Sequence, residues 1–158
     1  MSRGVAIHAA TTALWLLLQQ GGVSSLLTGI VFGFLLLVVL RDLLGVRDYV
    51  RRVLGFFKFC WVFGRELVLA NFTLARAVLF RPVREIRADF LSLPVAGLSP
   101  LEIYLLAQCI TLTPGTTTVE VAGDGSELVL HAFDASDPQA VRDGIDRTLR
   151  AAILEFTR

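Results

Sequence analysis

Charge is almost absent from the first quarter of the chain. Arg3 is the only charged residue before Arg41, which leaves an uncharged run of 37 residues from Gly4 to Leu40. A helix that spans a bilayer needs about 20 predominantly apolar residues. Hydrophobic residues make up 54% of the sequence and its mean hydropathy is +0.67, above the norm for soluble proteins. The first quarter is therefore predicted to lie in a lipid bilayer.

Cysteine is scarce as well, and its two positions argue against two kinds of site. Cys60 and Cys109 stand in apolar surroundings, with no C-x-x-C pair and no histidine at ligand spacing. This pattern suggests neither a zinc site nor a disulfide framework, and both residues are predicted to be packed thiols facing a reducing compartment. His8 is expected to be either a neutral imidazole that bonds a carbonyl or a functional ionisable group within the membrane. His131 is expected to be a packing or surface residue.

The sequence also lacks a recognisable catalytic site. An enzyme needs a nucleophile, a base and an orienting group, or else a set of metal ligands. The threonine-rich segment 113–118 does not have the lysine and glycine spacing of a P-loop. We therefore expect no enzymatic activity, no metal and no cofactor.

The two halves of the chain differ in the sign of their charge. Residues 1–87 carry eleven Lys and Arg against four Asp and Glu, whereas residues 88–158 carry four against ten. The basic residues adjoin apolar segments, which is typical of membrane topology and not of a nucleic-acid footprint. We expect no nucleic-acid partner.

The uncharged run must be interrupted, because one helix of that length would measure about 55 Å against a hydrocarbon core of about 30 Å. Residues 19–22, Gln-Gln-Gly-Gly, favour a turn. The sequence thus predicts a hairpin of two membrane-spanning helices, at about 5–18 and 23–40. A cleaved signal peptide is the weaker alternative for the first helix, since no A-x-A cleavage pattern follows it.

A row of small residues lies in the second predicted helix. Ser25, Gly29 and Gly33 recur at every fourth position. Such a row lets another helix approach closely, and the alternative is that glycine is simply common in membrane helices.

The third apolar stretch, residues 53–80, contains charged side chains. At 100° per residue, Lys58, Arg65 and Arg76 project within about 20° of one another, so three cations share one stripe. Either this helix lies in the membrane interface with its cations in water, or it spans and packs them against acidic partners in other subunits. The distribution of basic clusters favours the interfacial arrangement. Glu66 is expected to be a charge partner of Arg65 or, alternatively, a proton relay.

From residue 82 onwards the sequence has the signals of a small soluble domain. The run 83–93 is compatible with a strand. Ser99-Pro100-Leu101-Glu102 is a capping box with proline at the first helical position, and it opens a helix that reaches about residue 110. Thr113-Pro114-Gly115, called the signature loop below, is predicted to end that helix and turn the chain.

A hairpin and a final helix complete this predicted domain. Two β-rich runs, 116–121 and 127–133, are joined through an Asp-Gly pair, and Asp137-Pro138 starts the last helix. The resulting fold class is a membrane α-helical region followed by a small α+β domain of order β-α-β-β-α, with both helices on one side of the sheet. We predict a membrane region at 1–81 and a cytoplasmic domain at 82–158.

Several motifs resemble one known family. The run 110–116, Ile-Thr-Leu-Thr-Pro-Gly-Thr, is followed by Val119-Glu120-Val121 and by His131-Ala132-Phe133-Asp134, and this order is similar to that of E subunits of multisubunit Mrp-type Na+/H+ antiporters. The similarity to that family extends upstream to Glu66-Leu67, Ala70-Asn71 and Arg76-Ala77-Val78-Leu79. The resemblance therefore covers nearly the whole chain. Arg87-Ala88-Asp89 departs from it, because family members often carry Pro-Gly there, and the start of the first strand is left open.

The resemblance implies an accessory subunit of a hetero-oligomeric antiporter in the bacterial plasma membrane, which exchanges Na+ or another monovalent cation for protons. Its partners would be the lipid bilayer and the other subunits, among them large membrane subunits related to respiratory complex I that carry the ion path. The subunit would serve assembly and coupling. The candidate interface or coupling residues are Lys58, Arg65, Glu66, Arg76, Ser25, Gly29 and Gly33, with the signature loop Thr113, Pro114 and Gly115.

Two other functions are compatible with the same sequence. The first is the equivalent subunit of a membrane-bound hydrogenase complex that contains an Mrp module. The second is a stand-alone membrane-anchored module whose sheet binds a soluble partner by adding a strand.

Overall fold

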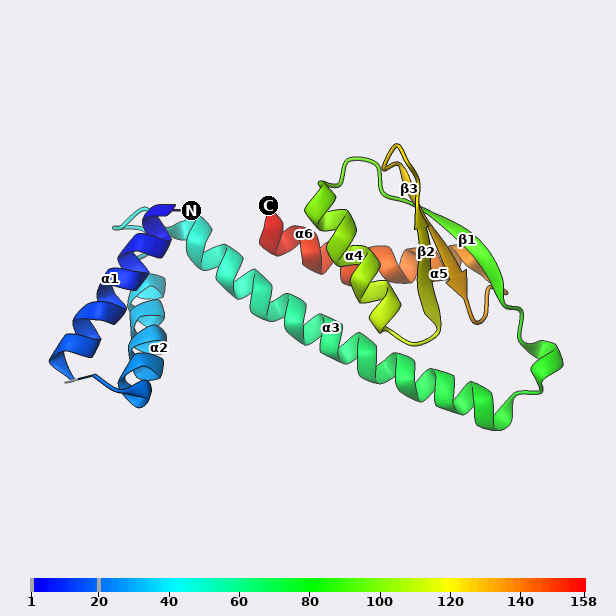
Figure 1. The fold of residues 1–158 in the computed structure, drawn as a ribbon, viewed down its shortest axis with the longest axis horizontal. Coiled ribbons are helices and arrows are strands. Elements are labelled where there is room, and N and C mark those ends of the chain that lie inside the picture. The colour runs from blue at the N-terminus through cyan, green and yellow to red at the C-terminus, as the bar shows by residue number, and fades with distance from the viewer. Residues whose placement is uncertain (1, 20) are drawn as a thin grey trace. The chain divides into compact units, whose positions relative to one another are not determined.

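The computed structural model describes residues 2–19 and 21–158, and the chain divides into two compact units between Leu54 and Gly55. The chain is mostly helical, with one small three-stranded antiparallel sheet (Figure 1). The helices are α1 (Ser2–Leu18), α2 (Val23–Leu40), α3 (Arg47–Phe80), α4 (Pro100–Leu112), α5 (Pro138–Ile145) and α6 (Ala151–Thr157). The strands are β1 (Asp89–Pro94), β2 (Thr116–Val121) and β3 (Glu127–Ala132).

The first unit contains a helical hairpin in which α1 and α2 pack side by side (Figure 1). The predicted turn falls between them, although Gln20 lies outside the described residues. Within the described part of the chain, α2 is the one helix that is long and apolar enough to cross a membrane, with a mean hydropathy of 2.6, while α1 is a shorter apolar helix. One candidate span is therefore supported, and the second stays a prediction.

The small residues of α2 face α1. A Cβ atom added at Gly33 would lie 2.8 Å from Thr11 Oγ1, and one added at Gly29 would lie 3.0 Å from Trp15 Cδ1. A side chain at Gly33 would overlap Thr11, and one at Gly29 would require Trp15 to shift, so a close helix approach of the kind predicted from the small residues is made inside the hairpin.

His8 of α1 links the hairpin to the start of α3. Its Nε2 lies 2.8 Å from the Ile30 carbonyl oxygen, and its Nδ1 lies 2.6 Å from the Tyr49 hydroxyl. Because a carbonyl only accepts, Nε2 carries the proton of this bond. The expected bond between His8 and a carbonyl is confirmed.

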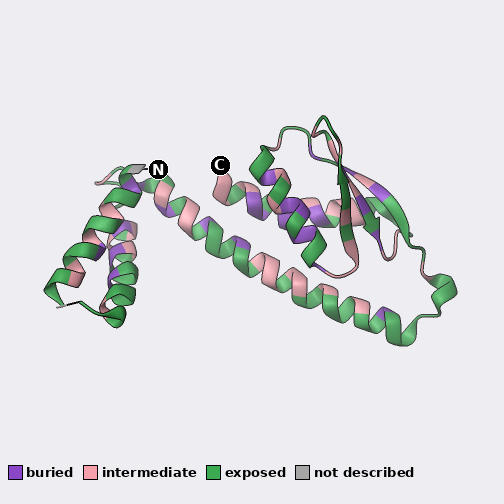
Figure 2. Cartoon of the chain, viewed as in Figure 1, coloured by how far each residue is buried: buried purple, intermediate pink, exposed green. Residues whose placement is uncertain are grey.

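The sheet of the second unit has the order β1-β3-β2, with both pairs antiparallel. Leu130 of the central strand pairs with Leu91 on one side and with Thr118 on the other, and a bulge follows Thr118 in β2. The buried residues gather between one face of the sheet and the helices α4, α5 and α6 (Figure 2). The helices thus cover one face of the sheet, as the sequence predicted.

The main differences from the prediction concern β1, the last helix and α3. β1 begins at Asp89 and not at residue 83, because Val83–Glu85 forms a 3-10 turn. The last helix is divided by a five-residue π-helical segment, Asp146–Arg150, which a search for a period of 3.6 does not reveal. α3 begins at Arg47, six residues before the predicted start at 53.

Most of α3 belongs to the α/β unit. Phe59 of α3 is part of that unit's core, and its ring centroid lies 5.2 Å from that of Phe156 in α6 and 6.2 Å from that of Phe63. A Cβ atom added at Gly55 would lie 3.1 Å from Phe156. The compact units therefore separate within α3, while the membrane boundary at residue 81 stays a prediction.

The close packing in the hairpin gives a stability prediction. Replacing Gly33 by alanine should lower the apparent free energy of unfolding of the full chain in detergent by roughly 1–3 kcal/mol, because the new methyl group overlaps Thr11. The matched control is Gly64→Ala in α3, where a Cβ atom meets nothing within 4 Å and alanine should be neutral or stabilising by up to about 1 kcal/mol. Thermal unfolding followed by circular dichroism measures both, and equal effects would contradict the packing.

Candidate subunit-coupling site

The signature loop lies where α4 ends and β2 begins. Thr113 caps α4, since its amide and its hydroxyl both donate to the Cys109 carbonyl, at 3.1 and 3.0 Å. Pro114 cannot continue the helix. Gly115 has a φ of +104°, a region that favours glycine, and its carbonyl accepts from the Phe133 amide at 2.8 Å. The loop thus fixes the end of α4 to the sheet.

Glu66 of α3 faces this loop across a small cavity. The cavity has a volume of about 210 Å³, and Glu66 and Ala70 line it together with Thr113, Pro114 and Thr116. The structure therefore brings together two candidates that are almost fifty residues apart in the sequence. Among the described residues that line the cavity, Glu66 is the only ionisable one.

Arg65 is the charge partner of Glu66, as expected. Arg65 Nη1 donates to Glu66 Oε1 at 2.6 Å, and the Glu66 side chain is only 25% exposed, against 58% for Arg65. The ion pair keeps the Glu66 carboxylate beside the loop, and its role in coupling stays a prediction.

A second hollow of about 340 Å³ continues along the same face of α3. Thr73 and Arg81 of α3 line it opposite Gly115 and Asp134. Arg81 and Asp134 form an ion pair at 2.5 Å. Hydrogen bonds from Ser136 and Arg81 lower the pKa of Asp134 to about 2, so this carboxylate is charged at physiological pH. The far end of α3 is thus tied to the segment that follows β3.

The predicted cation stripe of α3 is exposed to solvent, and two of its members have partners within the chain. Lys58 donates to Glu155 of α6 at 2.7 Å, and Arg65 pairs with Glu66. Arg76 makes no ion pair among the described residues. Gly29 and Gly33 belong to the first unit, where they face α1 within the hairpin.

The comparison with protein families decides which class of protein has this site. A family model described as Na+/H+ ion antiporter subunit matches residues 8–156, which include α3 and the signature loop. The chain belongs to this family of antiporter subunits. The resemblance inferred from the sequence motifs is confirmed, and membership makes the chain a component of a secondary transporter and not an enzyme.

Relatives of this antiporter subunit match it over most of their length. It is 30% identical over 159 aligned positions to the E subunit of the Na(+)/H(+) antiporter of Alkalihalophilus pseudofirmus, and the alignment covers 100% of both chains. It is also 30% identical over 145 positions to the corresponding E subunit of Bacillus subtilis, covering 91% of each. Among solved structures, a chain of the membrane-bound sulfane sulfur reductase, an archaeal respiratory membrane complex, is similar in fold. The TM-score is 0.55 at 23% identity, over 96% of this chain and 99% of that chain.

The antiporter subunit also has a buried ionic group that sequence reasoning assigned only in part. Glu102 completes the predicted capping box with Ser99, but it is only 3% exposed and also accepts from Arg158 Nε at 3.1 Å and from the Thr157 hydroxyl at 2.7 Å. The bonds from Arg158 and from the Ser99 amide lower the pKa of Glu102 to about 2. No local pattern reveals a contact between residues 56 positions apart.

The Glu102 group gives a pH-dependent prediction. Glu102→Gln should lower the free energy of unfolding of the full chain at pH 7 by roughly 1–3 kcal/mol, because the buried network loses its negative charge and one of its two acceptor oxygens. Since the pKa of Glu102 is depressed from 4.5 to about 2, the stability it adds is complete above pH 4.5 and is lost as the pH falls towards 2. Denaturant unfolding in detergent between pH 7 and pH 3 should therefore show a deficit that shrinks with acidity. An exposed control, Glu85→Gln, should change little at any pH, and a pH-independent deficit for Glu102→Gln would contradict the assignment.

Proposed function

We propose that this antiporter subunit serves assembly and coupling of a multisubunit Na+/H+ antiporter, while larger membrane subunits related to respiratory complex I carry the ion path. The observation that carries the proposal is the packing of α3. This helix begins in the unit of the membrane hairpin, and its stretch from Glu66 to Arg81 packs against the signature loop of the α/β unit. The partners of the subunit are then the bilayer and the other subunits of the complex.

We further propose that both α1 and α2 span the plasma membrane. Support comes from their pairing along most of their length and from the exposed apolar residues of both helices. The start of α1 lies beside the start of α3, since Gly4 packs against Tyr49. Arg3 therefore lies at the same end of the hairpin as the basic cluster Arg41, Arg47, Arg51 and Arg52. Positive residues mark the cytoplasmic side, so this end and the α/β domain are cytoplasmic.

We propose that α3 lies in the cytoplasmic membrane interface and does not span. The face opposite its packed stripe carries large apolar side chains at alternating intervals of four and seven residues, which places them on one side of a helix. These exposed residues are Phe57, Trp61, Val68, Phe72 and Leu79. Exposed cations border this face, and the combination of aromatic residues with flanking Lys and Arg is typical of interfacial helices. Because the opposite face of α3 packs against the α/β domain, the exposed apolar face is the one that can contact lipid.

The coupling role is tested by reversing one charge. Arg65→Glu should reduce recovery of the other antiporter subunits with the tagged chain by roughly tenfold, because it places a second carboxylate beside Glu66 and removes the partner that holds it. Affinity purification from the native membrane in mild detergent, with quantitative mass spectrometry, measures the recovery.

The matched control for that experiment is Asp124→Asn at the tip of the β-hairpin. Its side-chain oxygen bonds the Ser126 amide, an interaction that asparagine retains, so recovery should be unchanged. Equal behaviour of both variants would remove Glu66 and Arg65 from the coupling site. Recovery of hydrogenase or other respiratory subunits in place of antiporter subunits would assign the chain to such a complex, and recovery of the chain alone would favour a stand-alone module.

The orientation of α3 is tested with Trp61. In a Trp15→Phe variant, Trp61 is the only tryptophan, and its fluorescence in proteoliposomes should be quenched most strongly by lipids brominated near the headgroup. A variant with Trp15→Phe, Trp61→Phe and Tyr104→Trp, which moves the probe to the α/β domain, should not be quenched. Strongest quenching by deeply brominated lipids would show that α3 spans, and absence of quenching would show that protein or water covers this face.

A further inference from the structure

The two edge strands of the sheet differ in whether their outward backbone groups are available for hydrogen bonding. Those of β1 are covered. Arg142 Nε donates to the Ser92 carbonyl at 2.6 Å, and Arg150 donates to the Pro94 carbonyl two residues later. Alternate carbonyls of a strand point to the same side, so these two arginines cover the outer edge of β1. Pro94 itself has no amide proton to offer. Proline and charged side chains of this kind prevent an edge strand from pairing with another chain.

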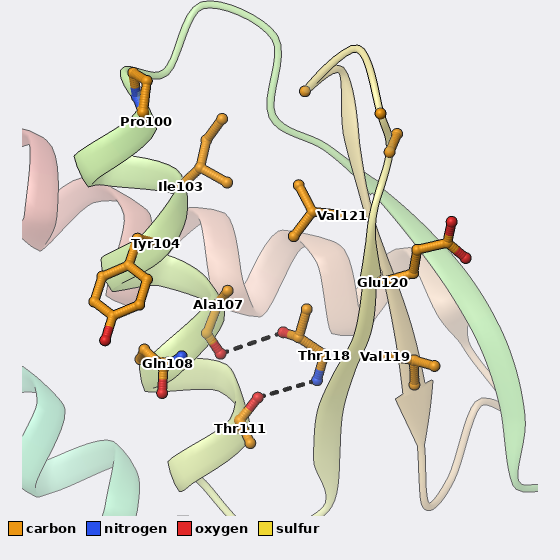
Figure 3. A pocket seen from close by; sticks show the side chains of 13 residues that line it. Pro100, Ile103, Tyr104, Ala107, Gln108, Thr111, Thr118, Val119, Glu120 and Val121 are labelled. Atoms are coloured by element: carbon orange, nitrogen blue, oxygen red, sulfur yellow. Dashed lines mark hydrogen bonds between the residues drawn. The ribbon is translucent and has the colours of Figure 1, made fainter.

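The β2 edge is covered only at one end. The Thr118 amide donates to Thr111 Oγ1 at 3.1 Å, and the Thr118 hydroxyl donates to the Ala107 carbonyl at 3.2 Å, so α4 covers β2 at this residue (Figure 3). In the part of the chain that the structure describes, no hydrogen bond covers the outer edge beyond Thr118. Val119 and Val121 are 56% and 46% exposed there.

An apolar groove adjoins this open half of the strand. It has a volume of about 650 Å³ and lies between β2 and α4, with Pro100, Ile103 and Tyr104 on the helix side (Figure 3). Val121 points into it from the strand, because Val121 pairs with Leu128, whose side chain is on the helix-covered face. A residue of an added strand that points towards α4 would therefore enter an apolar site.

The charge on this surface has one sign. Glu120 is the only charged residue among the described residues that line the groove, and Asp124 follows in the adjacent turn. Glu120 pairs with Val129 and points to the side of the sheet away from α4 (Figure 3). A strand added beside β2 would be stabilised by a Lys or Arg opposite Glu120, since opposite charges on neighbouring strands attract.

We propose that the open edge of β2 and the α4 groove bind an extended segment of another antiporter subunit, which adds a fourth strand to the sheet. The segment carries an aliphatic residue towards Ile103 and Val121 and a basic residue beside Glu120. A second copy of this chain fits less well, because it would bring the same acidic residues, Glu120 and Asp124, to the contact. This proposal rests on the proposed function in one respect: it takes the partner to be another subunit of the same antiporter complex.

The test places a photocrosslinker in the groove of the full chain within its native membrane. Tyr104, which is 60% exposed, is replaced by p-benzoylphenylalanine, a substitution that keeps an aromatic ring. The matched control is the same replacement at Leu112, which is also 60% exposed on α4 but does not line the groove. The position 104 probe should crosslink to one other subunit, through an extended segment with apolar and basic residues, and the control should give little of that product.

A charge variant adds a second readout. Glu120→Lys should lower the yield of that crosslink by roughly fivefold, and Glu85→Lys, the same charge change outside the groove, should leave it unchanged. Co-purification of antiporter subunits with a missing crosslink at position 104, or a crosslink only to lipid or to a second copy of the chain, would overturn this inference and leave the proposed function intact. A crosslink to a soluble protein without co-purifying antiporter subunits would overturn the proposed function and the subunit partner together.

Discussion

The insertion of one face of α3 into the α/β core is the constraint from which the rest of the architecture follows. Phe59 is part of that core and contacts both Phe63 and Phe156 of α6, so the helix cannot be separated from the domain without exposing an aromatic cluster. This packing determines which side of α3 faces the signature loop. It also determines which side stays uncovered, and that opposite face carries exposed apolar side chains such as Trp61 and Phe72.

The polar contacts of α3 are consistent with this arrangement. Glu66 is paired with its neighbour Arg65 within α3, and Arg81 is paired with Asp134, so one ion pair joins the far end of α3 to the segment that follows β3. The pairs are partly exposed and add little energy individually. The Arg81–Asp134 pair fixes the end of α3 relative to the sheet, while apolar packing around Phe59 supplies most of the contact.

Features set by neighbouring residues were predictable from the sequence, and features set by distant residues were not. The capping box at Ser99, the Asp137 cap and the bounds of β2 follow from local chemistry. The pairing of Lys58 with Glu155 and of Glu102 with Arg158 joins residues that only the finished fold brings together. For α3, periodicity revealed the cation stripe but not the face that packs, because both faces are rich in apolar residues. The juxtaposition of Glu66 and Thr113 could be suspected only from their shared presence in one family pattern.

The bond from His8 to the Ile30 carbonyl has a mechanical consequence for the membrane hairpin. With both helices in the bilayer, as proposed above, no water replaces a lost hydrogen bond, so an imidazole moved away from its acceptor stays unsatisfied at a cost of several kcal/mol. In the observed alignment Thr11 occupies the gap at Gly33, and Trp15 occupies the gap at Gly29. The His8 bond therefore favours this one alignment of α1 and α2, so that a displacement of either helix is resisted by the other.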